Sequence, residues 1–207
     1  MMSTLRAWQR TVFTARWRAA WLIAAAAILL PEVALAHEGG VAGGLVSGFT
    51  HPIFGLDHVA AMVAVGLWGA FLGQPAIWLL PVVFPLVMAF GGLLGIFGVP
   101  VPAVETGIAA SALALGAVVA LALRPPLWVA AVLVGAFAIF HGHAHGTELP
   151  QAANPLAYGA GFVIATGLLH LSGIALGLLA RWPAGVGAVR VGGGAIACAG
   201  IYFLVGA

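Results

Sequence analysis

Charged residues are scarce in this sequence, and their scarcity excludes an ordinary soluble domain. They make up 6% of the 207 residues, whereas hydrophobic residues make up 63%. A soluble domain carries roughly a quarter charged residues. A chain with a mean hydropathy of +1.16 is therefore expected to lie in a lipid bilayer.

Lysine is missing altogether, and the arginines are unevenly placed along the chain. Four of the seven arginines lie within the first eighteen positions: Arg6, Arg10, Arg16 and Arg18. The isoelectric point near 9.3 therefore describes the N-terminus, and it gives no reason to expect a nucleic-acid partner.

Cysteine occurs once, at Cys198, within an apolar run. A single thiol excludes an internal disulfide, a thiolate metal site and a redox pair, so we interpret Cys198 as a packing residue. The sequence also has no glycine-rich loop of the Walker type, which excludes nucleotide hydrolysis by that route.

Residues 1–36 have the pattern of a secretory signal peptide. An arginine-bearing region is followed by an apolar stretch, a helix-breaking Pro31 and an A-x-A cleavage site that ends at Ala36. The alternative is an uncleaved anchor helix, although the apolar stretch is short for a membrane span. Cleavage after Ala36 would make His37 the first residue of the mature chain, where its α-amine and imidazole together could bind a metal ion.

Beyond residue 36, apolar segments alternate with breaks marked by proline and glycine. We expect an all-α fold over residues 37–207, a polytopic membrane helix bundle of six transmembrane helices. The helices are predicted at residues 55–73, 76–98, 103–123, 127–147, 155–180 and 188–206. Residues 41–50 are too few to span, so we expect a broken or re-entrant entry to the first helix, interrupted at Pro52 and Gly55.

The remaining arginines indicate the orientation of the bundle. If the mature N-terminus is outside, Arg124, Arg181 and Arg190 all fall in cytoplasmic loops, as the positive-inside rule requires. The predicted location is the cytoplasmic membrane of a bacterium, with a periplasmic N-terminus. In this orientation every mature acidic residue and six of the seven histidines lie near the outer face, where chance would not gather them.

The first histidine-rich stretch contains His51, Asp57 and His58 within eight residues. A carboxylate at membrane depth costs several kcal/mol unless a cation compensates it. His51 and His58 share one helix face if the backbone between them is helical. An unwound turn would instead bring all three side chains to one point.

The second stretch runs from His141 to Glu148. His141, His145 and Glu148 follow an i, i+4, i+7 spacing and share one helix face, whereas His143 points elsewhere. Imidazole nitrogen with some carboxylate suits Ni²⁺, Co²⁺ and Zn²⁺, and the lack of a nearby thiolate argues against copper(I). We therefore expect a membrane protein that binds a transition-metal ion and moves it across the bilayer.

Three further candidate ligands have simpler explanations. Glu105 starts a predicted helix, where the helix dipole stabilises a carboxylate. His170, about midway along the fifth predicted helix, is either a packing residue or a deeper relay for the ion. His37 could equally belong to a solvated tail.

The two stretches also resemble the motifs of a known family. HPIFGLDH, from His51 to His58 and followed after seven residues by Gly66, resembles the HPxxGxDHxxxxxxxG signature of the HupE/UreJ family of nickel and cobalt permeases. HAHGTE, from His143 to Glu148, is similar to that family's HAHGxE motif. The resemblance covers the whole chain.

The resemblance implies a secondary permease that brings Ni²⁺, or Co²⁺, into the cytoplasm for hydrogenase or urease maturation. The ion is then a transported substrate, and no tightly bound cofactor is expected. The resemblance assigns metal recognition to the motif residues His51, Asp57, His58, His143, His145 and Glu148. It includes His143 where the argument from helix faces favours His141.

Three other functions stay open at this point. An intramembrane zinc hydrolase would use the same ligands to hold a metal-bound water, although no separate general base stands out. A membrane cytochrome would bind haem through histidines of two helices, which leaves the carboxylates without a role. The third is a metal-sensing or metal-binding component of a separate transporter. We favour a transporter over an enzyme, and the sequence does not indicate the oligomeric state.

Overall fold

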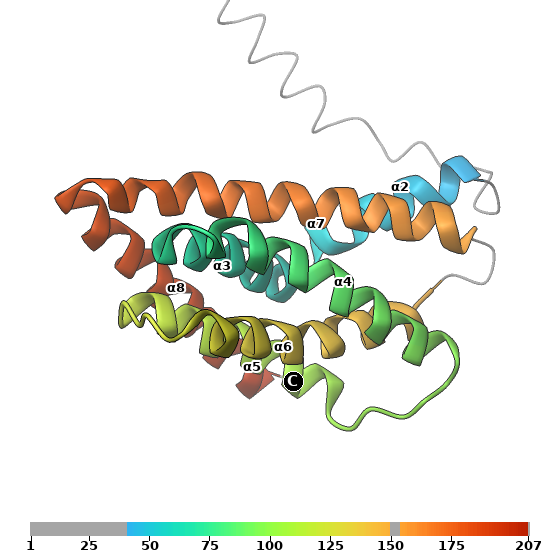
Figure 1. Ribbon diagram of the computed structural model, residues 1–207. Helices are drawn as coiled ribbons and strands as arrows, with labels where there is room; N and C mark the ends of the chain where they lie inside the picture. Colours follow the sequence, from blue (N-terminus) through green and yellow to red (C-terminus); the bar gives the residue numbers. More distant parts are fainter. Residues whose placement is uncertain (1–40, 150–153, 207) are drawn as a thin grey trace, which may run out of the picture. The chain divides into compact units, whose positions relative to one another are not determined.

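The computed structural model describes residues 41–149 and 154–206, and within these ranges all regular structure is helical. The predicted all-α class is therefore confirmed. The elements, labelled as in Figure 1, are α2 (Val41–Phe54), α3 (Leu56–Leu72), α4 (Ala76–Ile96), α5 (Val104–Ala120), α6 (Leu127–Thr147), α7 (Pro155–Gly177), η1 (Leu178–Arg181) and α8 (Pro183–Gly206). The predicted signal peptide and His37 lie outside the described residues.

Four of the helices, α4, α6, α7 with η1, and α8, are long and apolar enough to cross a membrane. The pair α2 and α3 adds a fifth candidate if it is one bent span. Helix α5 has 17 residues, about 25 Å at roughly 1.5 Å per residue, whereas the hydrocarbon core is about 30 Å thick. The chain is thus a multi-pass membrane protein, and the count of six spans stays a prediction.

The entry to the first predicted helix is a helix of its own. Residues 41–54 form α2, and the chain turns by 81° where α2 meets α3 at Gly55. The prediction that Pro52 takes part in this interruption is wrong, because Pro52 lies inside α2. A proline removes one backbone donor from a helix, and α2 ends two residues later at Phe54, so the loss is confined to its last turn.

The last helix begins earlier than predicted, at Pro183 and not at residue 188. Proline suits the first helical position, because its φ angle is already helical and its missing N–H has no helical partner to lose. The proline that was interpreted as a break therefore also starts the next helix.

Glycines allow α4 and α6 to pack backbone against backbone. A Cβ atom on Gly142 would lie 1.9 Å from the carbonyl oxygen of Met88, and one on Gly146 would lie 2.2 Å from that of Gly92. Such close approach is what small residues provide in membrane bundles. Both Gly142 and Gly146 belong to the second histidine-rich stretch, so this stretch fixes the helix packing in addition to carrying imidazoles.

The arginines of the helix connections and the histidine-rich stretches lie at opposite ends of the bundle. Arg124, between α5 and α6, and Arg181, in η1, lie at one end of the bundle, on the left in Figure 1. The connection from α4 to α5 and the C-terminal end of α6 lie at the opposite end, together with α2. The histidine-rich stretches therefore meet at the end that lacks these arginines.

Candidate metal site

The two histidine-rich stretches converge on one row of imidazoles. His51 lies in the last turn of α2, His58 in the first turn of α3, and His141 and His145 in the last turns of α6. The ring centroids are 4.9 Å apart for His51 and His145, 4.5 Å for His145 and His58, and 4.7 Å for His58 and His141. The bend at Gly55 makes this possible, because it lets α2 and α3 present their histidines to α6 from two directions.

The outer end of the row is a group of three potential ligands, His51, His145 and Glu148, which we call the outer group. His51 Nε2 lies 3.1 Å from Glu148 Oε2, and one ligand atom from each of the three residues lies within 4.8 Å of the others. Two ligands of one ion are at most about 4.2 Å apart, twice a metal–nitrogen bond of roughly 2.1 Å. A small closing movement would therefore let all three bind one ion.

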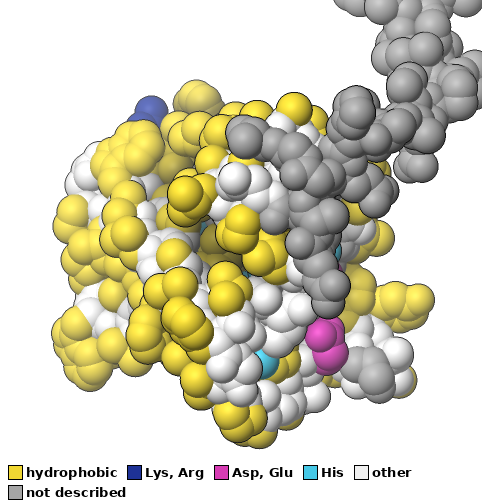
Figure 2. All heavy atoms as spheres, turned by 90° about the vertical axis from the view of Figure 1, so that its right-hand side faces the viewer, with side chains coloured by type: hydrophobic (Ala, Val, Ile, Leu, Met, Phe, Trp, Pro, Cys, Tyr) yellow, Lys and Arg dark blue, Asp and Glu magenta, His cyan; other side chains and the backbone are white. Residues whose placement is uncertain are grey.

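The outer group is open to water. The side chains of His51 and Glu148 are 38% and 51% exposed, whereas His145 is buried. Figure 2 shows acidic and histidine side chains at the surface of this end of the bundle, among backbone atoms and apolar side chains. A hydrated cation can thus reach Glu148 and His51 before it meets any buried group.

His58 is oriented by the adjacent carboxylate. Asp57 Oδ1 accepts a hydrogen bond from His58 Nδ1 at 2.9 Å and another from the His58 backbone N–H at 2.8 Å. A carboxylate can only accept, so Nδ1 carries the proton and Nε2 keeps its lone pair. Nε2 is buried and has no hydrogen-bond partner among the described residues. A carboxylate behind a histidine in this way is the usual support for a metal-binding imidazole.

His141 is oriented by a residue that the sequence analysis did not single out, Ser111 in α5. The Ser111 hydroxyl donates to the carbonyl of Ile108 at 2.6 Å and accepts from His141 Nε2 at 2.9 Å. Nδ1 of His141 therefore keeps its lone pair, and this buried atom has no partner within the described ranges. A serine within the apolar middle of α5 is the sequence signal that could have indicated this role.

His145 belongs to the outer group and also adjoins the pair His58 and His141, which we call the inner pair. Both of its ring nitrogens are buried without a hydrogen-bond partner in the described part of the chain. Its ring packs against Phe162 of α7 at a centroid distance of 4.1 Å. A neutral imidazole has one lone-pair nitrogen, so His145 can bind an ion on the side of the outer group or, after its proton moves to the other nitrogen, on the side of the inner pair.

His143 is not part of the row. Its Nε2 donates a hydrogen bond to the carbonyl of Val99 at 2.8 Å, in the connection between α4 and α5. The face that α6 turns toward α2 and α3 carries His141, His145 and Glu148, as the i, i+4, i+7 spacing predicts. His143 thus has a structural contact outside the row, while its Nδ1 is buried without a partner among the described residues. The metal-binding role that the family motif implies for His143 stays a prediction.

Glu105 and His170 lie on either side of the row. Glu105, in the first turn of α5, lines a pocket of about 270 Å³ with Asp57 and with Tyr202 of α8. His170 is buried in α7, and the ring of Phe84 lies between it and His141, 5.4 Å from each ring centroid. Glu105 thus lies beside Asp57, which supports His58, and His170 lies beyond the buried end of the row.

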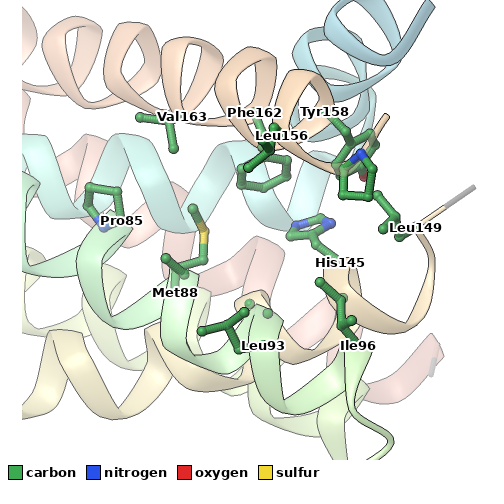
Figure 3. Close-up of a pocket in the computed structure, with 16 residues that line it drawn as sticks. Pro85, Met88, Leu93, Ile96, His145, Leu149, Leu156, Tyr158, Phe162 and Val163 are labelled. Atoms are coloured by element: carbon green, nitrogen blue, oxygen red, sulfur yellow. The ribbon is translucent and has the colours of Figure 1, made fainter. Parts of the chain in front are cut away.

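A larger pocket, of about 450 Å³, opens beside His145 between α4, α6 and α7. Figure 3 shows its apolar walls, which include Met88, Phe162 and Val163; of the lining residues, His145 and Tyr158 have polar side chains. A hydrated cation would lose its water in such a pocket without finding ligands to replace it. The polar route to His145 is therefore from His51 and Glu148.

Comparison with known proteins identifies the family of this chain. The sequence model of the family described as HupE / UreJ protein matches residues 25–203. The chain is 50% identical over 181 residues to Protein HupE of Rhizobium leguminosarum bv. viciae, an alignment that covers 87% of this chain and 95% of that protein. No solved structure matches the chain.

Proposed function

The chain belongs to the HupE/UreJ family, and on that premise we propose that it is a permease that takes up Ni²⁺ or Co²⁺ across the cytoplasmic membrane. The family is of the transporter type and is associated with nickel and cobalt uptake for hydrogenase and urease. The proposed substrate is the divalent ion itself, which enters from the periplasm and leaves to the cytoplasm.

The row of imidazoles carries this proposal. Its supporting contacts leave the lone pairs of His58 Nε2 and His141 Nδ1 buried and unpartnered within the described residues, next to both nitrogens of His145. Leaving buried acceptors unpaired costs about 1–3 kcal/mol each, so such a group is retained for a ligand. Imidazole nitrogens with one carboxylate are the donors that Ni²⁺ and Co²⁺ prefer.

The order of burial along the row suggests how the ion moves. It first exchanges water for Glu148 and His51, which are exposed, and then for His145, which is buried. Rotation of the His145 ring passes the ion to His58 and His141. Several partial sites of this kind fit conduction better than one closed cage, because each must release the ion to the next.

The charges support an orientation with the imidazole row outside. Arg124 and Arg181 lie at the opposite end of the bundle from the row, and cytoplasmic loops carry the excess of arginine in membrane proteins. In that orientation the end with Glu148 and His51 faces the periplasm, which also agrees with a cleaved signal peptide at residues 1–36.

Uptake of ⁶³Ni²⁺ at nanomolar concentration by nickel-starved cells tests the proposal. Wild-type cells should accumulate the ion, and Asp57→Ala and His58→Ala at matched membrane expression should stay at the vector background. The matched control is His143→Gln, which changes a buried histidine of the same stretch outside the row and should keep most of the uptake. Parallel measurements with ⁵⁷Co²⁺ separate the two candidate ions.

Wild-type cells that accumulate neither ion would refute transport by this chain alone. Uptake that is lost equally in His58→Ala and His143→Gln would instead show that the row has no special part in it. A purified protein that holds stoichiometric zinc and hydrolyses a lipid or peptide would replace the permease with the intramembrane hydrolase.

A further inference from the structure

A second group of unpartnered polar atoms lies deeper in the bundle than the row. His170 and Thr166 of α7 are 1% and 0% exposed. Neither ring nitrogen of His170 nor the hydroxyl of Thr166 forms a hydrogen bond with any described residue. The two residues are four positions apart, so their side chains lie on the same face of the helix.

A backbone carbonyl completes this group. The carbonyl of Pro81, in α4, faces the His170 ring. The residue four positions further on, Pro85, has no N–H, so it cannot donate the helical hydrogen bond that this carbonyl would otherwise accept. The pair of prolines therefore leaves one oxygen acceptor free at membrane depth, beside a buried imidazole.

The position of His170 is held tightly by α3. A Cβ atom on Gly66 would lie 2.0 Å from the carbonyl oxygen of His170, so only glycine allows α7 to pack at this distance. Gly66 is the last residue of the first motif, eight residues after His58. The motif that contains His51 and His58 thus also fixes the backbone position of His170.

One aromatic ring separates this group from the inner pair. Phe84 of α4 contacts the rings of both His141 and His170, each at a centroid distance of 5.4 Å, and is itself fully buried. A cation at His141 thus has one side chain to pass before it meets the next set of nitrogen and oxygen donors.

We propose that His170, Thr166 and the Pro81 carbonyl form a second, inner binding site for the divalent cation, reached from the inner pair by displacement of the Phe84 ring. The inference rests on the proposed function and extends it. When the ion binds, one ring nitrogen of His170 turns to donate to the Pro81 carbonyl, and the other, with the Thr166 hydroxyl, binds the ion. As in His58 and His141 of the row, one ring nitrogen would be held by a hydrogen-bond acceptor and the other would bind the ion.

The first test places a thiol where the ion is proposed to bind. In full-length protein carrying Cys198→Ser, His170→Cys is loaded with Co²⁺ and its absorption spectrum is recorded. A sulfur-to-cobalt charge-transfer band in the near ultraviolet is expected, because a thiolate that binds Co²⁺ gives one. The matched control is Ser172→Cys in the same background, on the exposed side of the same helix, where no such band is expected.

The visible absorption spectrum of Co²⁺ bound to the row distinguishes failure of the inner site from failure of the proposed function. If that spectrum is present and His170→Cys gives no charge-transfer band, or if Ser172→Cys gives an equal one, the inner site is refuted and the proposed permease is untouched. If wild-type protein gives no cobalt spectrum at all, the proposed function itself fails, and the inner site fails with it.

The second test does not depend on a new thiol. In proteoliposomes, His170→Ala and Thr166→Val should each slow Ni²⁺ uptake, His170→Ala by at least roughly tenfold, while equilibrium binding of Ni²⁺ to the row stays as in the wild type. Uptake at the wild-type rate in both variants would overturn the proposal. Loss of binding together with uptake in His170→Ala would overturn it too, since the residue would then support the row and not a separate site.

Discussion

The contact between Asp57 and His58 gives the sharpest prediction about the row. Asp57→Asn keeps the size of the side chain and its acceptor oxygen but removes the charge. A hydrogen bond to a charged group is worth about 1.5–3 kcal/mol and a neutral one about 0.5–1.5 kcal/mol. The difference of about 1–1.5 kcal/mol corresponds to a loss of about 5- to 12-fold in Ni²⁺ affinity, at roughly 1.36 kcal/mol per tenfold.

The exposure of the Asp57 side chain determines where in this range the loss of Ni²⁺ affinity should fall. The Asp57 side chain is 29% exposed, so solvent screens part of its charge and the lower end is expected. Asp57→Ala removes the acceptor altogether, and the loss should then reach roughly 10- to 100-fold, as for other residues that support metal-binding histidines. The assay is titration calorimetry of Ni²⁺ with purified full-length protein.

Glu105→Gln is the matched control for this prediction. Glu105 shares a pocket with Asp57, so Glu105→Gln removes an equal charge from the same place. The Glu105 carboxylate, unlike that of Asp57, makes no hydrogen bond to an imidazole in the described part of the protein. Asp57→Asn should weaken binding more than Glu105→Gln. Equal losses would mean that Asp57 acts only through its charge, and unchanged affinity in Asp57→Asn would refute the supporting role.

Three further predictions concern packing, the histidine outside the row and pH. Gly142→Ala should lower the melting temperature in detergent, because its Cβ would lie 1.9 Å from the backbone oxygen of Met88 and overpacking costs about 1–3 kcal/mol or more. Gly159→Ala is the control and should leave the melting temperature unchanged, because Gly159 has open space around it. Equal melting temperatures for the two variants would contradict the packing of α4 on α6. His143→Ala should also lower the melting temperature, by removing the donor to Val99, but calorimetry should find an unchanged Ni²⁺ affinity, and a tenfold loss would return His143 to the ligands. Because Ni²⁺ binds neutral imidazole and competes with protons, affinity should fall as pH decreases from about 7.5 to 5.5, through the range where histidine ordinarily titrates. Full affinity at the lower pH would argue against binding that is limited by histidine protonation.

Local features of the sequence predicted much of this protein. The breaks at residues 73–75, 100–102 and 124–126 separate the helices as expected, because proline and glycine act on the backbone where they stand. The shared face of His141, His145 and Glu148 followed from helical periodicity alone. Membership of the HupE/UreJ family, which the motifs predicted, is confirmed by the comparisons.

Where local signals were ambiguous, the prediction was less accurate. Pro52 and Gly55 both qualify as helix breakers, and the sequence could not tell that only Gly55 lies at the bend. Pro183 could end one helix or begin the next, and the choice depends on how α8 packs on its neighbours. The count of six spans depends on α5, whose 17 residues are near the lower limit for crossing a bilayer.

By itself, then, the sequence determined a helical membrane protein with two groups of metal-binding side chains, since hydropathy, periodicity and residue type are local properties. Only the tertiary structure decided which histidines meet. It directs His143 to the carbonyl of Val99, supports His141 through Ser111 of another helix, and separates His170 from the row by one phenylalanine. These pairings join residues far apart in the chain, and they depend on how closely the glycines let each pair of helices approach.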